Sequence, residues 1–237
     1  MCAHQLRNSG TAGLLYLVVA VGGSFALYVR SRIIESGDAA VTADNIRVSA
    51  TLFRVGFVSD LVAATCFLLT AMALYLLLRH VHQLVAAAMV TFVAVGTAIA
   101  CLSLLNQYTA LTIATGDDYT RTFGKAGSDA LTMLFADMQS VAGMFFGLWL
   151  LPLGYLVIKS GYFPKMLGVL LIIGCFGYLA DLFVGFLAPD VEASIGLFFA
   201  GIGGLSEVLF IAWLLVKAVR VPAREAPVPA TAHQLQP

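Results

Sequence analysis

The stretch Phe53-Arg54-Val55-Gly56-Phe57-Val58-Ser59-Asp60-Leu61 places an arginine and an aspartate at the start of an apolar run that continues to Leu78. A charged residue inside hydrocarbon costs about 2.5–3.5 kcal/mol on insertion scales, so it needs a partner or a function there. Three later apolar runs each contain one acid as well: Asp137, Asp181 and Glu207. Several of these runs exceed the roughly 18 apolar residues that indicate a membrane span. The pattern therefore predicts membrane helices that carry a few intramembrane acids.

The composition supports the same fold class. Of the 237 residues, 60% are apolar and 11% are charged, whereas soluble domains have about 45–50% and about 25%. The 13 basic and 13 acidic residues cancel, so no overall field favours nucleic acid. The four cysteines are far apart and form no CxxC or Cys/His cluster, so we expect neither disulfides nor a metal site. We predict an all-α, polytopic transmembrane helix bundle in the lipid bilayer, without a cofactor.

The apolar runs predict six spans within a single domain, residues 1–220. Asp38 is expected to cap a short surface helix, 39–49, and Pro152 is expected to kink the fourth span. Residues 221–237 are rich in Pro and Ala without an apolar period, so we expect a disordered tail. The expected spans are roughly 11–31, 52–78, 84–108, 129–158, 165–187 and 194–219.

The orientation follows from the connections between the spans. Six spans place both termini on one side, but Lys and Arg are divided almost evenly between the two sides, and the positive-inside rule alone does not decide. Acids in the connections are concentrated on the side away from the termini. The short, almost acid-free connections are therefore expected to be cytoplasmic, with both termini inside and the chain in the cytoplasmic (inner) membrane. The acids on the opposite side are Glu35, Asp38, Asp44, Asp117, Asp118, Asp129, Asp190 and Glu192.

The intramembrane acids are the candidate site. With a rise of about 1.5 Å per residue, all four fall in the outer half of the membrane, each on a helix face of small or polar residues suited to helix contact. We expect them to converge on an outward-facing acidic pocket, with Arg54 as the main counter-charge. The candidate ligand-binding or polar-core residues are Arg54, Ser59, Asp60, Asp137, Asp181 and Glu207, and the residues at the mouth are Arg30, Arg32, Asn106 and Gln107.

Three roles remain open for these acids. They could form a structural polar network, with carboxyl groups protonated or paired, or they could bind a small ligand or cation for transport or sensing. Intramembrane catalysis is the weakest, because the histidines that hydrolytic membrane enzymes usually need all lie outside the spans, at His4, His80, His82 and His233. We assign no catalytic residue and no metal ligand. The alternative to the pocket is a non-catalytic accessory or assembly subunit, whose protein partners the sequence does not specify.

Several short motifs lie along the apolar runs and their connections. They are Phe53-Arg54-x-Gly56-x-x-Ser59-Asp60, Gly154-Tyr155-Leu156, Ser160-Gly161-Tyr162-x-Pro164-x-x-Leu167-Gly168, Tyr178-Leu179-x-Asp181, and Glu207 with Trp213-Leu214-Leu215. Together they resemble an uncharacterised bacterial multi-pass membrane family, the domain of unknown function 4386. The resemblance covers roughly residues 10–220 and implies six or seven membrane helices without a known activity. Family members often carry a histidine near Gln139 and another near Trp149; both are absent here, which further weakens a catalytic or metal-binding role.

Overall fold

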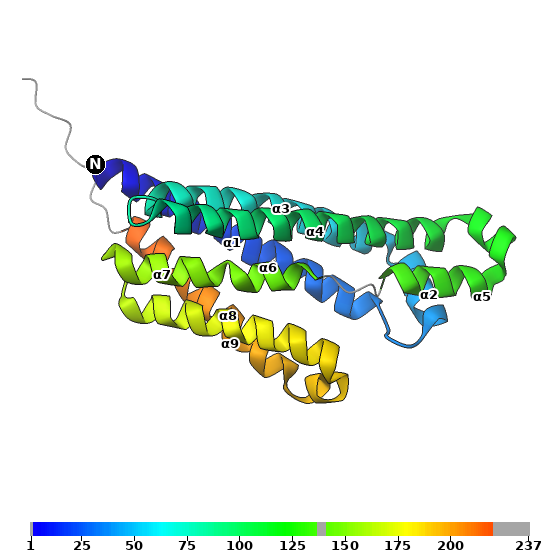
Figure 1. Cartoon of the computed structure of the whole chain (residues 1–237). Coiled ribbons are helices and arrows are strands. Elements are labelled where there is room, and N and C mark those ends of the chain that lie inside the picture. Colours follow the sequence, from blue (N-terminus) through cyan, green and yellow to red (C-terminus); the bar gives the residue numbers. More distant parts are fainter. Residues whose placement is uncertain (1, 137–140, 220–237) are drawn as a thin grey trace, which may run out of the picture.

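The computed structural model describes residues 2–136 and 141–219, and all regular secondary structure in these residues is α-helical. The all-α prediction is therefore confirmed. The long helices lie along one another in an elongated bundle (Figure 1). In order along the chain they are α1 (Cys2–Ile33), α2 (Ala39–Val48), α3 (Ala50–Leu78), α4 (Gln83–Thr115), α5 (Asp117–Ala136), α6 (Ala142–Leu148), α7 (Leu150–Ser160), α8 (Lys165–Leu187) and α9 (Pro189–Val219).

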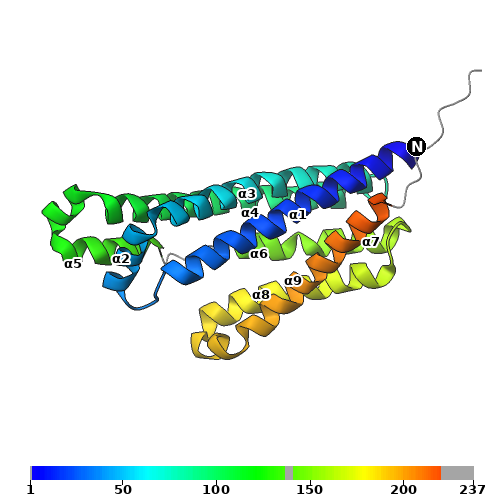
Figure 2. The same cartoon turned by 180° about the vertical axis from the view of Figure 1, so that it is seen from behind.

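Five segments of the described chain are long and apolar enough to cross a membrane, which makes this a multi-pass membrane protein. They are Gly10–Ile33 of α1, the helices α3, α4 and α8, and Ala142–Ser160, which contains α6 and α7. The 31-residue α9 packs against α8 and α1. The N-terminal end of α1, the end of α9 and the α3–α4 turn lie at one end of the bundle (Figures 1 and 2).

The opposite end carries a layer that the sequence interpretation placed differently. The fourth span was expected to start near 129, but α5 is a separate helix, broken at Gly124 (φ 71°), and it packs on α4 and α2. The span that follows it starts at Ala142. The ion pairs of Asp129 explain the difference, because its carboxylate is bound by Arg47 of α2 and by Lys125 and so belongs to a charged layer.

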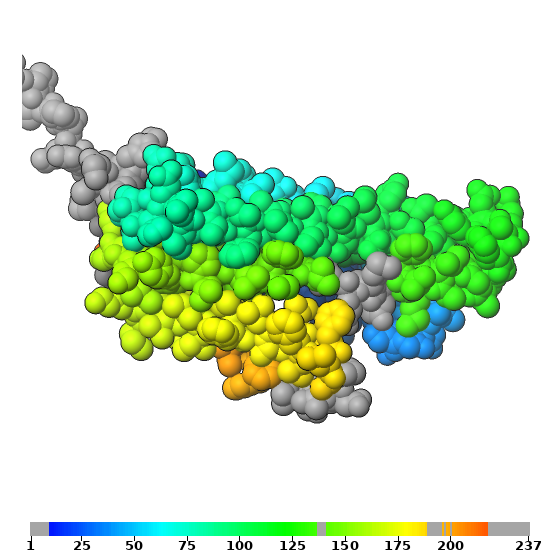
Figure 3. All heavy atoms as spheres, in the orientation of Figure 1, coloured from blue at the N-terminus to red at the C-terminus, as the bar shows by residue number. Residues whose placement is uncertain are grey.

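The length of α4 explains where this layer lies. Its 33 residues correspond to about 50 Å, whereas the hydrocarbon core is about 30 Å thick. It was expected to end at residue 108 but continues to Thr115, alongside α5. We call α2, α5 and the last turn of α4 (111–115) the cap. Figure 3 shows α2 and α5 together beyond the end of α8.

Pro152 interrupts the fourth apolar span as expected. Proline lacks the N–H that would bond to the carbonyl of Leu148, four residues earlier, and α6 ends at that residue. The chain stays close to helical at Trp149 (φ −64°, ψ −24°). The Trp149 N–H donates to the Phe145 carbonyl at 3.1 Å, and the Leu153 N–H donates to the Trp149 carbonyl at 3.3 Å. The proline therefore separates α6 from α7 while the two continue as one span.

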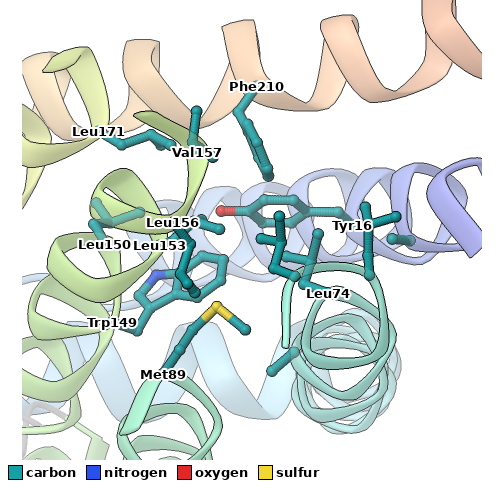
Figure 4. Packing of buried hydrophobic residues seen from close by; sticks show 14 of the residues in the cluster. Tyr16, Leu74, Met89, Trp149, Leu150, Leu153, Leu156, Val157, Leu171 and Phe210 are labelled. Carbon is teal, nitrogen blue, oxygen red and sulfur yellow. The ribbon is translucent and has the colours of Figure 1, made fainter. Parts of the chain in front are cut away.

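An aromatic layer forms the centre of the bundle (Figure 4). The ring of Trp149 lies 4.9 Å from that of Phe67 and 5.6 Å from that of Tyr16, centroid to centroid. Tyr16 also meets Phe210 edge-on at 6.4 Å. These side chains come from α1, α3, α9 and the α6–α7 junction. Their ring contacts join these four segments at one buried position in the bundle.

Candidate functional site

Glu207 lies at this buried point and is bound by two tyrosines. Its carboxyl group accepts a hydrogen bond from the Tyr16 hydroxyl at 2.5 Å and one from the Tyr178 hydroxyl at 2.7 Å. The three residues belong to α9, α1 and α8. A carboxyl group in hydrocarbon needs such donors, so Glu207 joins three helices through its own hydrogen bonds.

A glycine on α9 positions Tyr178. A Cβ atom added to Gly203, one turn before Glu207, would lie 2.6 Å from the Tyr178 ring. The ring therefore packs directly on the α9 backbone, which places its hydroxyl at Glu207. Gly174 on α8 completes the close approach, because a Cβ there would lie 2.4 Å from the Ser206 hydroxyl oxygen.

Aromatic side chains bury one side of this layer, while Glu207 and Tyr178 themselves are partly exposed. Trp149 and Phe210 are completely buried, and Tyr16 is 2% exposed; Figure 4 shows Tyr16 between these two rings. The Trp149 indole N–H lies beside Glu207 but makes no hydrogen bond of normal geometry with the described residues. The layer thus contains a bonded carboxyl group and one buried donor without a hydrogen bond of normal geometry in the described chain.

Asp60 is paired at a different place. It forms a salt bridge with Arg30 of α1, and the two side chains are 19% and 27% exposed. The expectation that Arg54 is its counter-charge is wrong: Arg54 is exposed and has no ion pair among the described residues. Arg54 lies six positions before Asp60 on the same helix, which places the two side chains on different faces. Arg30 instead lies on α1, which packs directly on α3. Beside the pair, the Ser59 hydroxyl donates to the Gly22 carbonyl at 3.0 Å.

The structure does not bring Asp60 and Glu207 together. Their partners on α1, Arg30 and Tyr16, are 14 positions apart, which corresponds to about 21 Å along a helix. The expected convergence therefore fails for these two acids, because they occupy different levels of the bundle.

The other sequence-predicted residues are scattered along the bundle. Asp181 is half-buried on α8, one turn beyond Tyr178, and Asp137 lies outside the described residues. Asn106 and Gln107 are half-buried on α4. Arg32 is exposed, and its guanidinium lies 5.4 Å from the centroid of the Tyr28 ring. Among the described residues, no three His, Cys, Asp or Glu side chains cluster as metal ligands.

A charged network holds the cap. Asp129 is 3% exposed and accepts from Arg47 Nη2 at 2.6 Å and from Lys125 Nζ at 2.9 Å. Arg47 Nε also donates to the Ala114 carbonyl at 2.7 Å, so the network ties α2 and α5 to α4. Burial opposes ionisation of Asp129, but hydrogen bonds from Lys125 and Arg47 outweigh burial and lower its pKa. Asp129, which lies outside the candidate membrane spans, is therefore buried and ionised.

The model of a family described as a domain of unknown function, DUF4386, matches residues 11–218. The chain belongs to the DUF4386 family. A stretch of 83 residues is 41% identical to an uncharacterized protein of Archaeoglobus fulgidus, over 35% of this chain and 48% of that protein. The chain thus aligns with about half the length of that relative. No solved structure matches the chain.

In this DUF4386 protein, sequence reasoning found the acid at position 207 but missed the groups that bind it. Tyr178 belongs to the motif Tyr178-Leu179-x-Asp181, and Tyr16 belongs to none of the motifs. A signal existed for Tyr16, since it is a hydroxyl-bearing residue inside the first apolar run. Its pairing with Glu207, 191 positions away, depends on which helices are neighbours, and periodicity does not give that.

Proposed function

We propose that this DUF4386 protein is a non-catalytic component of a membrane assembly, in which the intramembrane acids hold its own helices together. The observation that supports this most is the bonding of Glu207 by Tyr16 and Tyr178, which ties α9 to α1 and α8. Asp60 is likewise paired within the chain, with Arg30. Both carboxyl groups already have partners from neighbouring helices, as a structural polar network requires.

The cap supplies the surface for a partner in this proposal. It exposes apolar side chains beyond the spans: Val48 is 88% exposed, Phe123 58% and Val41 42%. Exposed apolar side chains outside lipid are typical of interaction surfaces when they gather. The Arg47–Asp129–Lys125 network keeps the two helices that carry them in fixed positions.

The proposal includes the topology. It takes α9 as a sixth span, both termini as cytoplasmic, and the cap as extracytoplasmic on the inner membrane. Two observations support it: α9 is 31 residues long, and its end lies at the same end of the bundle as the start of α1 (Figure 2).

Native mass spectrometry of the full chain, extracted from its own membrane in mild detergent, tests the assembly. We expect the 25.1 kDa chain in a complex of fixed stoichiometry with a different polypeptide. Val48→Lys should release that polypeptide, whereas Ser36→Lys, at an exposed position before α2, should not. Recovery of the chain alone, or only with copies of itself, would contradict the proposal.

A second candidate is the binding of a small ligand or ion at Glu207, for transport or sensing. The observation that favours it is the Trp149 N–H, a buried donor beside Glu207 that makes no hydrogen bond of normal geometry within the described chain. A buried donor without a partner costs free energy, and a ligand that accepts a hydrogen bond would remove that cost.

Tryptophan fluorescence tests this second candidate. The chain has two tryptophans, so Trp213→Phe leaves Trp149 as the reporter. A saturable change on addition of a small hydrogen-bond acceptor, absent in the Glu207→Gln variant, would support binding there. An unresponsive Trp149 would exclude it for the acceptors tried. Transport is tested separately by measuring solute uptake into proteoliposomes that contain the unsubstituted chain. This uptake is compared with uptake into proteoliposomes that contain the Asp60→Asn or Glu207→Gln variant.

A further inference from the structure

A groove lies between α3 and α4 on the outside of the bundle. It has a volume of about 440 Å³ and is lined by Met72, Tyr75, Leu76, Ala87, Val90 and Thr91. Met72 and Leu76 are about half exposed, so the groove opens toward lipid and is separate from the Glu207 layer. Its size is in the range of small-molecule sites, about 300–1,000 Å³.

The lining of the groove is apolar in effect. Its two hydroxyl groups belong to Tyr75 and Thr91, and that of Thr91 already donates to the Ala87 carbonyl at 3.1 Å. The remaining surface comes mainly from aliphatic and thioether side chains. Because this surface faces the hydrocarbon region, it suits an acyl chain better than a polar solute.

One end of the groove carries positive charge. Positions 72, 75, 76 and 79 fall on one face of a helix, and Arg79 continues α3 with helical dihedrals (φ −58°, ψ −22°). Arg79 therefore lies on the groove face, one turn closer to the α3–α4 turn. The connection between α7 and α8, at the same end of the bundle (Figure 1), is flanked by Lys159 and Lys165. Residues 79–88 and 157–173 contain no acid.

We propose that the groove binds an acyl chain of an anionic phospholipid whose phosphate is held by Arg79. Arginine can bind a phosphate with two parallel hydrogen bonds, and basic residues at a membrane surface favour anionic over zwitterionic headgroups. Tyr75 lies between the apolar floor and the charged end, as aromatic residues do at membrane interfaces. The site is independent of the proposed assembly role.

Native mass spectrometry with added lipid tests the site. We expect phosphatidylglycerol to bind about five- to tenfold more tightly than phosphatidylcholine with the same acyl chains, since one basic residue contributes about that factor. Arg79→Gln should remove the preference. Arg54→Gln, which removes an exposed arginine at the other end of α3, should leave it unchanged.

Substitutions that fill the groove provide a second test of lipid binding. Ala87→Trp should reduce the occupancy of both lipids, and Thr91→Phe, at an exposed position, does the same with less risk to folding. Leu102→Trp is the matched control, because Leu102 is 63% exposed on α4 and does not line the groove. Equal affinity for the two lipids, or occupancy unchanged by Thr91→Phe, would overturn the proposal.

Discussion

The Tyr178 hydroxyl reaches Glu207 because a glycine one turn earlier on α9 leaves room for the tyrosine ring. At the scale of single residues, therefore, the close approach of the helices decides which hydrogen-bond partner a polar group meets, as much as the chemistry of the group itself does. The sequence predicted that Glu207 would lie on a helix-contact face, and it does. The donor on the facing helix could not be predicted, because helical spacing orders residues within one helix and not between helices.

Removing one of these donors should weaken the bundle. Tyr178→Phe deletes a hydroxyl bonded to Glu207 and is expected to lower the free energy of unfolding by about 1–2 kcal/mol. Thermal or SDS-induced unfolding in detergent measures it. Tyr155→Phe is the control, because Tyr155 is 40% exposed, and its effect should stay within about 0.5 kcal/mol. Equal effects of the two substitutions would contradict the role given to the Glu207 hydrogen bonds.

Substitution of Arg30 and substitution of Arg54 should have different effects on the free energy of unfolding. Arg30→Gln leaves a partly buried carboxylate without its ion partner, so we expect a loss of about 1–3 kcal/mol in the same unfolding assay. Arg54→Gln removes an exposed arginine without an ion pair in the described chain and should change little. If Arg54→Gln were the more damaging substitution, the pairing described for Asp60 would be incorrect.

At the scale of helices, hydropathy predicted the bounds of the purely apolar helices correctly. It failed to predict where a helix ends once that helix extends beyond the lipid. The range 165–187 coincides with α8, because an apolar run between Pro164 and Pro189 covers the whole of that helix. The third span was expected to end at 108, where the apolar run ends, yet α4 continues because α5 packs along it and Arg47 bonds to its Ala114 carbonyl. Tertiary contacts, which the sequence pattern does not contain, stabilise those last turns.

The cap should open in acid. The folded-state pKa of Asp129 is lowered, so its contribution is complete above its ordinary pKa of 3.8 and is lost as the pH falls through the lowered value. Amide hydrogen exchange in α2 and α5, measured relative to the intrinsic rate at each pH, should therefore accelerate below about pH 4. Asp129→Asn should mimic this acceleration at neutral pH.

The control for the cap is another acid of α5. Asp118 has a side chain that is 94% exposed, 3.7 Å from Arg121, so Asp118→Asn should leave the exchange unchanged. Exchange in α2 and α5 that is insensitive both to Asp129→Asn and to pH would show that packing alone holds the cap.

At the scale of the whole molecule, the bundle has a short end and a long end. The short end carries the tight α3–α4 and α7–α8 turns, and the long end carries the cap (Figure 1). The sequence predicted this asymmetry from the lengths of the connections. It also predicted the helix in the first of the longer connections, where Asp38 caps α2 and accepts from the Val41 N–H at 3.0 Å. It did not predict α5 in the second connection or the packing of both helices on α4.

Labelling in intact cells tests the orientation. In a variant without the native cysteines, Ser160→Cys should be protected from a membrane-impermeant maleimide until the cells are opened. Ser36→Cys, in the connection before the cap, should react at once. Labelling of both positions from the same side would contradict a bundle with opposite ends across the membrane.

The reach of α4 has a practical consequence. Because this helix is about 20 Å longer than the hydrocarbon core is thick, it holds the cap clear of the headgroups. An antibody fragment raised against α2 and α5 would meet folded protein and not lipid. Such a fragment would give electron microscopy a rigid fiducial for a 25.1 kDa particle that is otherwise almost hidden in its micelle.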